Sequence, residues 1–225
     1  MPPLADQGYQ LIPNLLKTGA LPALRAEADR VAEKAGTVCV RHLRSRSALF
    51  HELSTSPLLL DLLPAGMRPV RSILFDKSPA SNWPVAWHQD LTIAVAERKT
   101  VPDYGPWSLK DEVPHVQPPL SLLECMITIR LHLDPTPATN GALKVLPGSH
   151  LHGRIPTEKV SAFAKSTPEV ICACIPGDAL LMSPLILNAS SRATTPTHRR
   201  VLHFEYAATD SLHPQLRWHE RNAAI

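Results

Sequence analysis

The sequence contains no apolar run of about 18 residues, the length that a helix needs to cross a bilayer. Its first residues, Met1-Pro-Pro-Leu-Ala-Asp, have neither the basic nor the apolar segment of a secretion signal. Charge of one sign is also scarce, because 23 Lys and Arg face 20 Asp and Glu and give a net charge of only +3. We therefore expect a cytoplasmic protein that binds neither membranes nor nucleic acid.

Glycine is scarce as well, with 9 residues against 23 prolines. Because proline builds turns and breaks helices, long uninterrupted helices should be few. The four cysteines are scattered along the chain. Cys172 and Cys174 would share one face of a strand, but no second cysteine pair completes a zinc site. We interpret all four as reduced cysteines in the core of a cytoplasmic protein.

The 225 residues suit one large domain, and a hydrophobic content of 44% is enough for a substantial core. Apolar residues from Leu21 to Val31 recur at helical spacing. They predict a helix that starts at a Thr18 cap, runs to about Lys34 and ends at Gly36. A second, short helix is predicted over 57–63.

Short strand-like segments with turns between them fill most of the remaining chain. This pattern predicts a mainly β protein, a sandwich or barrel with a helical N-terminal flank. The predicted strands are 70–75, 85–90, 91–95, 126–133, 142–146, 170–175, 179–182 and 200–207.

We expect a single domain over 1–225, divided into a helical flank (1–66), a β core (67–207) and a peripheral tail (208–225). A polar, proline-rich insertion over 97–119 interrupts the core. Long connections inside a compact domain are usually functional or disordered. We interpret this one as a loop that covers the functional site.

The strand over 126–133 alternates cleanly between apolar and polar residues. Thr128, Arg130 and His132 share one of its faces. In a two-sheet sandwich a polar face normally meets solvent. If it instead faces the interior, Arg130 and His132 would line a pocket, and the sequence alone leaves both arrangements open.

The segment Trp87-His88-Gln89-Asp90 is the candidate metal site. On a strand, His88 and Asp90 point to the same side, so an imidazole nitrogen and a carboxylate oxygen can bind one ion. Two histidines and one carboxylate on one face of an octahedron form the site of non-haem iron(II) oxygenases. A His-x-Asp pair alone is weak evidence, and the rest of the chain must supply the third ligand.

Five motifs together carry a family resemblance, because their order and spacings match the phytanoyl-CoA dioxygenase family. They are Trp87–Asp90, Asn140–His150, Pro176–Met182, Asn188–Ser190 and Arg199–Arg200. The resemblance runs from about Gly8 to Ala207. It implies a double-stranded β-helix, also called a jelly-roll or cupin-like fold, and the use of iron(II), 2-oxoglutarate and O₂. The implied reaction is the hydroxylation of a small organic substrate while 2-oxoglutarate is converted to succinate.

Carried over to this sequence, the resemblance makes His88 and Asp90 the first two metal ligands. Arg199, eleven positions after 188, would pair with the distal carboxylate of 2-oxoglutarate, and a guanidinium fork suits that role. Arg200 is the fallback, although it shares a strand face with apolar residues. Ser190 could donate a hydrogen bond to the same carboxylate.

Further pocket residues are expected with less support from the motifs. Lys77 and Trp107 are plausible pocket residues, and Trp83, Trp87 and Tyr104 could supply apolar walls. The basic run from Arg41 to Arg46 is a solvated surface or, alternatively, a lid for an anionic substrate. His150 is interpreted as a structural histidine.

The third metal ligand departs from the family pattern, because Asn188 stands where a histidine is expected. A neutral amide oxygen is a poorer donor to iron(II) than an imidazole nitrogen. Three explanations compete: the site is weak or dead, the amide or a water completes it, or His198 or His203 moves in. The expected function is a 2-oxoglutarate-dependent dioxygenase with a weakened metal site. The alternative is an inactive jelly-roll protein that binds a small carboxylate.

Overall fold

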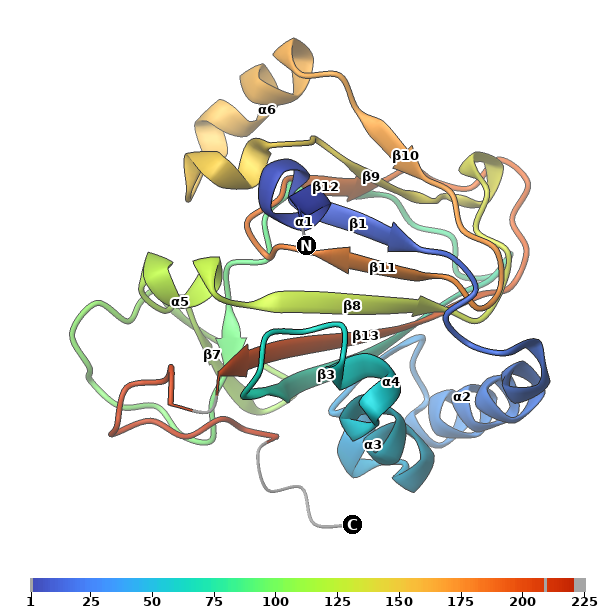
Figure 1. Cartoon of the computed structure of the whole chain (residues 1–225), viewed down its shortest axis with the longest axis horizontal. Helices are drawn as coiled ribbons and strands as arrows, with labels where there is room; N and C mark the ends of the chain where they lie inside the picture. Colours follow the sequence, from blue (N-terminus) through green and yellow to red (C-terminus); the bar gives the residue numbers. More distant parts are fainter. Residues whose placement is uncertain (1, 209, 221–225) are drawn as a thin grey trace.

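The computed structural model of the chain describes residues 2–208 and 210–220. Two antiparallel sheets face each other, and a third, three-stranded sheet lies beside them (Figure 1). The first sheet has the order β1-β11-β8-β13-β3-β2, and the second has the order β10-β9-β12-β4. Along the chain, strands are added to one sheet and then to the other, which is the winding of a jelly roll. The expected fold class is confirmed.

The larger sheet contains β1 (Tyr9–Ile12), β2 (Cys39–Arg41), β3 (Met67–Lys77), β8 (Ile127–His132), β11 (Ala179–Met182) and β13 (Arg199–Ala208). The smaller sheet contains β4 (Val85–His88), β9 (Leu143–Val145), β10 (Val170–Cys172) and β12 (Asn188–Ser190). Its register places Asn188 directly opposite His88 on the neighbouring strand.

The two faces of the larger sheet are used differently. Leu131 in β8 and Leu202, Phe204 and Tyr206 in β13 point to one face and belong to the main apolar cluster with the helices. Arg130, which alternates with them, points to the other face and toward the smaller sheet. The polar face of β8 is therefore interior, which settles the alternative that the sequence left open.

Three helices of the N-terminal part cover the apolar face of this sheet: α2 (Leu21–Ala35), α3 (Ala48–Thr55) and α4 (Pro57–Leu60) (Figure 1). The start of α2 differs from the prediction, because Thr18 begins a short 3₁₀ turn and does not cap the α-helix. Its end is as expected, since Gly36 takes a left-handed φ of 63° that glycine adopts without strain. The other helices are α1 (Pro2–Gln7), α5 (Leu120–Glu124) and α6 (Thr157–Ser166).

The predicted insertion over 97–119 is less irregular than expected. It contains β6 (Trp107–Lys110) and β7 (Val113–Val116), which form a hairpin and pair with β5 (Ile93–Ala94). Arg41 of the basic run donates to Asp111 at the tip of this hairpin, with an Nη1–Oδ2 distance of 2.8 Å. The insertion is thus a small sheet that is tied to β2.

Both ends of the chain are more integrated than the sequence suggested. The N-terminal flank contributes two strands, β1 and β2, to the larger sheet. The described part of the tail, 210–220, packs against the core, since Trp218 pairs with Val95 and is only 4% exposed. The carboxylate of Glu220 is buried and accepts hydrogen bonds from the backbone and hydroxyl of Ser72.

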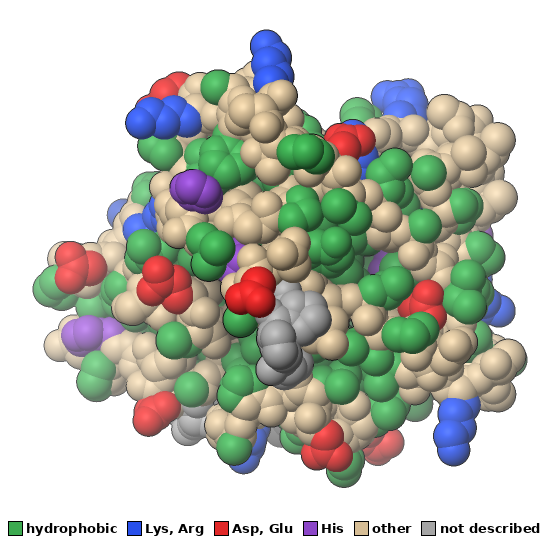
Figure 2. Space-filling view, turned by 45° about the horizontal axis from the view of Figure 1, so that its top comes forward, with side chains coloured by type: hydrophobic (Ala, Val, Ile, Leu, Met, Phe, Trp, Pro, Cys, Tyr) green, Lys and Arg blue, Asp and Glu red, His purple; other side chains and the backbone are tan. Residues whose placement is uncertain are grey.

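All four cysteines are free thiols, and two of them, Cys172 and Cys174, are buried as predicted. Cys39 is half-buried and Cys125 is exposed, so the expectation of core cysteines holds for only two of them. Within the described residues, none of the helices combines the length and the apolar character that a bilayer crossing demands. On the face shown in Figure 2, acidic and basic side chains are interspersed.

Candidate functional site

A cavity of about 130 Å³ lies between the two sheets. Its polar lining brings together residues from five strands or their ends: Lys77, His88, Asp90, Arg130, Asn188, Ser190, Arg199 and His203. Its apolar lining consists of Phe75, Trp83, Val85, Leu143, Ala189 and Val201. Nine residues that the sequence singled out for this site thus meet in one place, Trp83 and His203 among them.

His88 and Asp90 lie side by side at this cavity. The Nε2 atom of His88 is 3.5 Å from Oδ1 of Asp90, and Nδ1 of His88 donates to the carbonyl of Ala86 at 2.9 Å. The Ala86 hydrogen bond holds the ring and leaves Nε2 as the nitrogen available to a ligand. Two ligand atoms with bonds of ~2.1 Å at a right angle lie about 3 Å apart, so this spacing is close to that of a chelating pair.

The electrostatics of the pair favour its charged form. Burial alone would raise the pKa of Asp90, but the hydrogen bond and charge of His88 outweigh it and hold that pKa below its usual value. Burial alone would lower the pKa of His88, and Asp90 reverses that effect, so the pKa of His88 is raised. Asp90 is therefore an ionised carboxylate at neutral pH, as a metal ligand must be.

Asn188 lines the same cavity, directly opposite His88 on the neighbouring strand. Its Nδ2 atom lies 3.3 Å from the carbonyl oxygen of His88 and 3.3 Å from that of Ile186, and it donates to both. These two bonds orient the amide. Among the hydrogen bonds of the described residues, Oδ1 of Asn188 takes part in none, so it is the atom that the side chain can offer to a ligand.

His203 lines the cavity, but both of its ring nitrogens are engaged. Nη1 of Arg130 donates to Nδ1 at 3.0 Å, and Nε2 donates to Oε1 of Glu205 at 3.2 Å. Burial lowers the pKa of His203, so the ring is neutral and this tautomer is fixed. A ring with both nitrogens in hydrogen bonds has no lone pair left for a metal ion.

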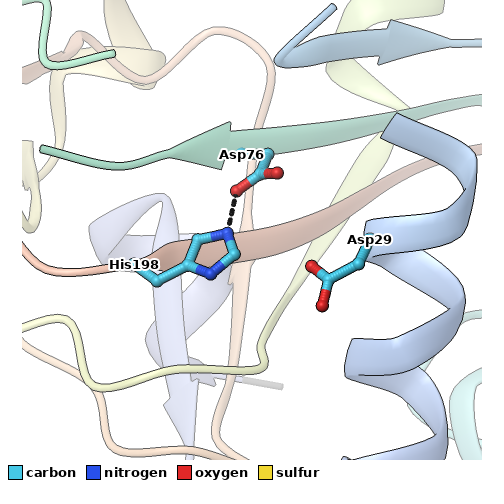
Figure 3. Close-up of side chains that lie close together, drawn as sticks. All are labelled: Asp29, Asp76 and His198. Atoms are coloured by element: carbon cyan, nitrogen blue, oxygen red, sulfur yellow. Dashed lines mark hydrogen bonds and ion pairs between the residues drawn. The ribbon is translucent and has the colours of Figure 1, made fainter. Parts of the chain in front are cut away.

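His198 points away from the cavity, toward the helix-covered side of the sheet. Its Nε2 atom lies 2.5 Å from Oδ1 of Asp76, and Asp29 on α2 completes a group of three possible ligands (Figure 3). Asp29 is already paired through both oxygens with Nη1 of Arg200, at 2.8 and 2.9 Å. In this structure His198 therefore lies outside the cavity, and His203 lies at the cavity with both ring nitrogens engaged.

The opposite end of the cavity is cationic. Lys77 and Arg199 are register partners on β3 and β13, and both are buried. Nζ of Lys77 donates to the carbonyl of Trp83 at 2.6 Å and to the hydroxyl of Ser190 at 3.3 Å. Burial, with the charges of Arg199 and Arg130, lowers the pKa of Lys77 to about 8. This end is suited to an anion.

Arg199 is positioned by the turn that the sequence signalled at Asn140-Gly141. One of its guanidinium nitrogens donates to the carbonyl of Gly141. Asn140 in turn donates to the Thr197 hydroxyl and accepts from the Thr197 backbone, which ties this turn to the segment that leads into β13. Burial, followed by the nearby charge of Arg130, lowers the pKa of Arg199 to about 10, so the side chain stays charged at neutral pH.

A family model for phytanoyl-CoA dioxygenase (PhyH) matches residues 4–201, which is most of the chain. The chain belongs to the phytanoyl-CoA dioxygenase family. This is a family of enzymes that use iron(II), 2-oxoglutarate and O₂, as the motifs had suggested. A comparison with curated proteins finds no match.

Solved structures with the same fold include several non-haem enzymes. SnoK, an α-ketoglutarate-dependent carbocyclase from nogalamycin biosynthesis, is 20% identical with a TM-score of 0.73, over 93% of this chain and 83% of SnoK. HygX from Streptomyces hygroscopicus, solved with nickel and 2-oxoglutarate, is 17% identical with a TM-score of 0.68, over 92% and 85%. AviO1 from Streptomyces viridochromogenes Tue57 is 20% identical with a TM-score of 0.69, over 94% and 95%. At these identities the comparison establishes the jelly-roll fold.

Arg200 was the alternative to Arg199 as the residue that would bind the distal carboxylate of 2-oxoglutarate. It lies on the other face of the sheet from Arg199. Its Nε and Nη2 atoms donate to the two oxygens of Asp134, both at 2.8 Å, and Asp29 takes up Nη1. Since this guanidinium faces the helices and is saturated by two carboxylates, it does not line the cavity. Of the two candidate arginines, Arg199 is the one that lines the cavity.

Four other expected pocket residues do not line the cavity. Tyr104 and Trp107 pack against the apolar cluster around the three-stranded sheet, and Trp87 packs against Leu187 and its neighbours on the far side of β4. His132 is on the inward face but is enclosed, and burial lowers its pKa to about 3. Within the described residues, the insertion over 97–119 contributes no cavity-lining side chain.

The basic run from Arg41 to Arg46 is partly structural. Arg44 is only 4% exposed and donates through Nε to the Ser54 hydroxyl and through Nη1 to the carbonyls of Pro69 and Glu220. Arg44 therefore joins α3, β3 and the tail, whereas Arg46 at the end of the run is exposed, as expected of a solvated surface. His150 behaves as expected of a structural residue, since its Nε2 donates to the carbonyl of Ala5.

The sequence reasoning missed the network that holds the inner end of the cavity. Arg71 donates to Oε1 of Glu205 at 3.0 Å, Glu205 accepts from His203, and His203 accepts from Arg130. The signal was present in the alternation of β13, where Arg199, Val201, His203 and Glu205 share a face. Only the pairing of β13 with β3 shows that Arg71 completes it.

Proposed function

We propose that this chain is an iron(II)- and 2-oxoglutarate-dependent oxygenase for a small organic substrate, with a metal site that Asn188 weakens. The observation that carries the proposal is the meeting, in one cavity, of the His88–Asp90 pair with Arg199 and Lys77. An oxygenase of this family needs a metal-binding end and a carboxylate-binding end, and these two groups of residues would supply them.

His88 and Asp90 would hold the ion through Nε2 and a carboxylate oxygen. Iron(II), when bound, supplies the reaction of O₂ with 2-oxoglutarate that leads to oxidation of the substrate. The Ala86 carbonyl fixes the His88 ring so that Nε2 stays directed at the site. Metal binding must displace the proton that Asp90 stabilises on His88, so metal affinity should rise with pH.

At the other end, Arg199, Lys77 and Ser190 would hold the distal carboxylate of 2-oxoglutarate. Ser190 accepts a hydrogen bond from Lys77, which leaves its own proton for the ligand. Arg199 uses one nitrogen for Gly141 and keeps other donors for the carboxylate. Phe75, Val85 and Val201 give this part of the cavity apolar walls that exclude water.

Asn188 sets the strength of the metal site. Its amide nitrogen is tied to two carbonyls, so only the neutral Oδ1 atom is left as a donor. Loss of outer hydrogen-bond partners of a metal site typically costs 10–100-fold in affinity, and we expect the loss of an imidazole ligand to cost at least that much. The site would then hold iron weakly, with Asn188 or water at the third position.

The test is the Asn188→His variant, measured beside the unchanged chain. We expect the variant to bind Mn(II), or iron(II) under anaerobic conditions, at least about tenfold more tightly in calorimetry. We also expect it to form succinate from 2-oxoglutarate in air at a higher rate. His88→Ala in the Asn188→His background is the matched control, because it removes one ligand and should abolish both effects.

Three results would bear on the proposal differently. Equal turnover by both chains would mean that Asn188 or water already completes the site, and the oxygenase assignment would stand without the weakening. Tight metal binding and turnover only in Asn188→His would identify a disabled member of the family. If neither chain binds metal, the assignment of His88 and Asp90 as ligands is wrong.

The second candidate function is a protein that binds a small carboxylate without turnover. The observation that favours it is the combination of Asn188 with three cationic side chains in the same cavity. The reaction type is equally open to test, since the solved relatives include a carbocyclase and an epimerase. Succinate formation is the readout that separates any oxygenase reaction from simple binding.

A further inference from the structure

Arg130 in β8 is a cation without a carboxylate partner. Its Nη1 atom donates to the neutral His203 ring at 3.0 Å, and its Cζ atom lies 5.4 Å from the centroid of the Phe75 ring. Its Nε atom is buried and has no acceptor within the part of the chain that the structure describes. Across residues 2–208 and 210–220, none of the arginine ion pairs includes Arg130.

This arrangement is costly unless an anion joins it. A guanidinium stays protonated under all ordinary conditions, and an uncompensated buried charge is strongly destabilising. Burial lowers the pKa of Arg130 by more than the nearby charge of Asp90 raises it, and Arg130 contributes to the lowered pKa values of Lys77 and Arg199. The three cations therefore repel one another in the free protein.

Asp90 is the only carboxylate that lines the cavity within the described residues, and it is paired with His88. Lys77, Arg130 and Arg199 line the same cavity. Positive charge thus remains in excess even with Asp90 ionised. A ligand with more than one negative charge would relieve the repulsion, while a neutral ligand would not.

The three cationic side chains come from two different positions along the strands of the larger sheet. Lys77 is the register partner of Arg199, and Arg130 is the register partner of His203, four residues further along β13. Four residues of strand correspond to about 13 Å between the backbone positions. Arg130 therefore approaches from the end where Asp90 and His203 lie, and Lys77 and Arg199 approach from the other end.

The orientation of Arg130 is built into the fold. Glu205 accepts from Nε2 of His203 and from Arg71, so Nδ1 of His203 is fixed as an acceptor for Arg130. The ring of Phe75 supports the guanidinium from another side. A side chain held from two sides, with donors still unused, is prepared for a ligand.

We propose that Arg130 binds a second carboxylate, so that the cavity holds a small dicarboxylate between Arg130 and the Lys77–Arg199 pair without a metal ion. This inference rests on the proposed function only for the Arg199 end of the site. Arg130 supplies, near Asp90, positive charge that a weakened metal site no longer provides. A four- or five-carbon dicarboxylate such as succinate or 2-oxoglutarate has the required charge at both ends.

The experiment is calorimetry on the full chain in EDTA, with 2-oxoglutarate, succinate and the monocarboxylate butyrate as probes. We expect both dicarboxylates to bind in the absence of metal. Arg130→Met should weaken them at least about tenfold, since hydrogen bonds to charged groups are the strong ones. Butyrate, held at the Lys77–Arg199 end, should change less than about twofold.

Arg68→Met is the matched control. Arg68 is an exposed arginine on β3 that donates to the carbonyl of Met67, away from the cavity, and its loss should change neither probe. Arg130→Lys keeps the charge without the planar fork and should lose an intermediate three- to tenfold, which provides a folded variant if Arg130→Met fails to fold. Thermal melting of each variant establishes that it is folded.

Two results would overturn the inference. One is a dicarboxylate affinity in folded Arg130→Met or Arg130→Lys within about twofold of the unchanged chain. The other is dicarboxylate binding that appears only after Mn(II) is added. The proposed function is judged separately by succinate formation. Turnover without metal-free binding would reject this inference alone, and metal-free binding without turnover in either chain would reject the oxygenase assignment alone.

Discussion

Lys77 is the residue whose charge responds to pH near neutrality. It lies at the end of β3, next to Ser190 and facing Arg199. Burial and the charges of Arg199 and Arg130 lower its pKa to about 8, from 10.5 in water. Below about pH 8 the ammonium is charged, and above about pH 8 it loses its charge.

The first prediction follows from this pKa. We expect the affinity for 2-oxoglutarate to fall as pH rises through about 8, because Lys77 loses its proton there while Arg199 keeps its own. A bound anion stabilises the ammonium, so binding at pH 8 should also take up a proton. Calorimetry in two buffers of different ionisation enthalpy, between pH 6.5 and 9.5, measures both effects.

Lys77→Met is the variant that checks the assignment. Its affinity should be weaker at pH 7 and should lack the decline near pH 8. Identical pH profiles for the variant and the unchanged chain would assign the titration to another group. Because the side chain lies at the cavity, this variant informs on binding and is not a measure of stability.

The neighbouring arginines of β13 point to opposite faces of the sheet, Arg199 to the cavity and Arg200 to the helices. Arg200 joins Asp134, which follows β8, to Asp29 on α2, so one side chain fastens the helix layer to the sheet. Burial alone would raise the pKa of Asp134, but the bonds from Arg200 reverse the effect and lower it. The stabilisation by this carboxylate is present at neutral pH and is lost as pH falls through its lowered pKa.

Arg200→Met should therefore cost stability. Breaking a buried ion pair by removing one partner typically costs about 3–5 kcal/mol, and the exposed side of Asp29 places our expectation near the lower figure. Urea denaturation at pH 7 measures the free energy of unfolding. Dicarboxylate affinity should change less than about threefold, whereas Arg199→Met should lose binding and keep most of its stability. The opposite pattern would reverse the roles of the two residues.

The turn at Asn140-Gly141 connects a local conformation to the cavity. Gly141 has a φ of +68°, and a Cβ atom there would lie 2.8 Å from the carbonyl oxygen of Ser191. Its own carbonyl accepts from Arg199. A side chain at this position would displace the segment whose carbonyl accepts from Arg199.

We expect Gly141→Ala to cost about 1–3 kcal/mol of unfolding free energy, from the left-handed backbone and the close contact. It should also weaken 2-oxoglutarate binding. Gly19→Ala is the control, since a Cβ there meets no atom within 4 Å. If both variants behave alike in denaturation and calorimetry, Gly141 has no special part in positioning Arg199.

At the level of elements, the periodicity of the sequence predicted which residues share a face of a strand. It did not predict whether that face meets the interior or solvent. The alternation over 126–133 predicted that Arg130 and Leu131 point to opposite faces of the strand. Which of these two faces is interior depends on how distant segments of the chain form the two sheets. The strands β6 and β7 were not predicted, because the insertion is rich in proline and proline is rare inside strands. The structure nevertheless pairs these two segments as a hairpin. The motif spacing singled out His88, Asp90 and position 188, which line one cavity in the structure, and their role as metal ligands stays a prediction.

Other parts of the site could not be predicted because they depend on register and on side-chain partners. The engagement of both His203 nitrogens requires Glu205 and Arg71 from a neighbouring strand. The removal of Tyr104 and Trp107 from the pocket follows from the way the small sheet packs on its own apolar cluster. Sequence patterns do not encode such contacts between distant segments.

At the scale of the whole molecule, the segment over 210–220 connects parts of the structure that are otherwise separate. Glu220 is 1% exposed and accepts from the backbone and hydroxyl of Ser72, at 2.8 and 2.6 Å. Its carbonyl accepts from Arg44. Trp218, Leu216 and Leu212 cover the apolar cluster around β5 and β7. The helix layer, the larger sheet and the small sheet all meet at this segment.

Glu220→Ala should destabilise the whole protein by about 2–4 kcal/mol, because it leaves buried donors of Ser72 without an acceptor. Glu158→Ala, at an exposed position in α6, is the control and should change the free energy of unfolding by less than about 0.5 kcal/mol. Denaturation by urea distinguishes them. Equal stability of the two variants would show that the tail contributes little.

The pairing of β3 with β13 has a consequence for synthesis on the ribosome. Arg71 and Glu205 lie 134 positions apart, and Ser72 and Glu220 lie 148 apart. At about 5–20 residues per second, roughly 7–27 seconds pass between the translation of Arg71 and that of Glu205. During that interval the edge of β3 that later pairs with β13 has no partner strand, so we expect its apolar side chains to be exposed to solvent.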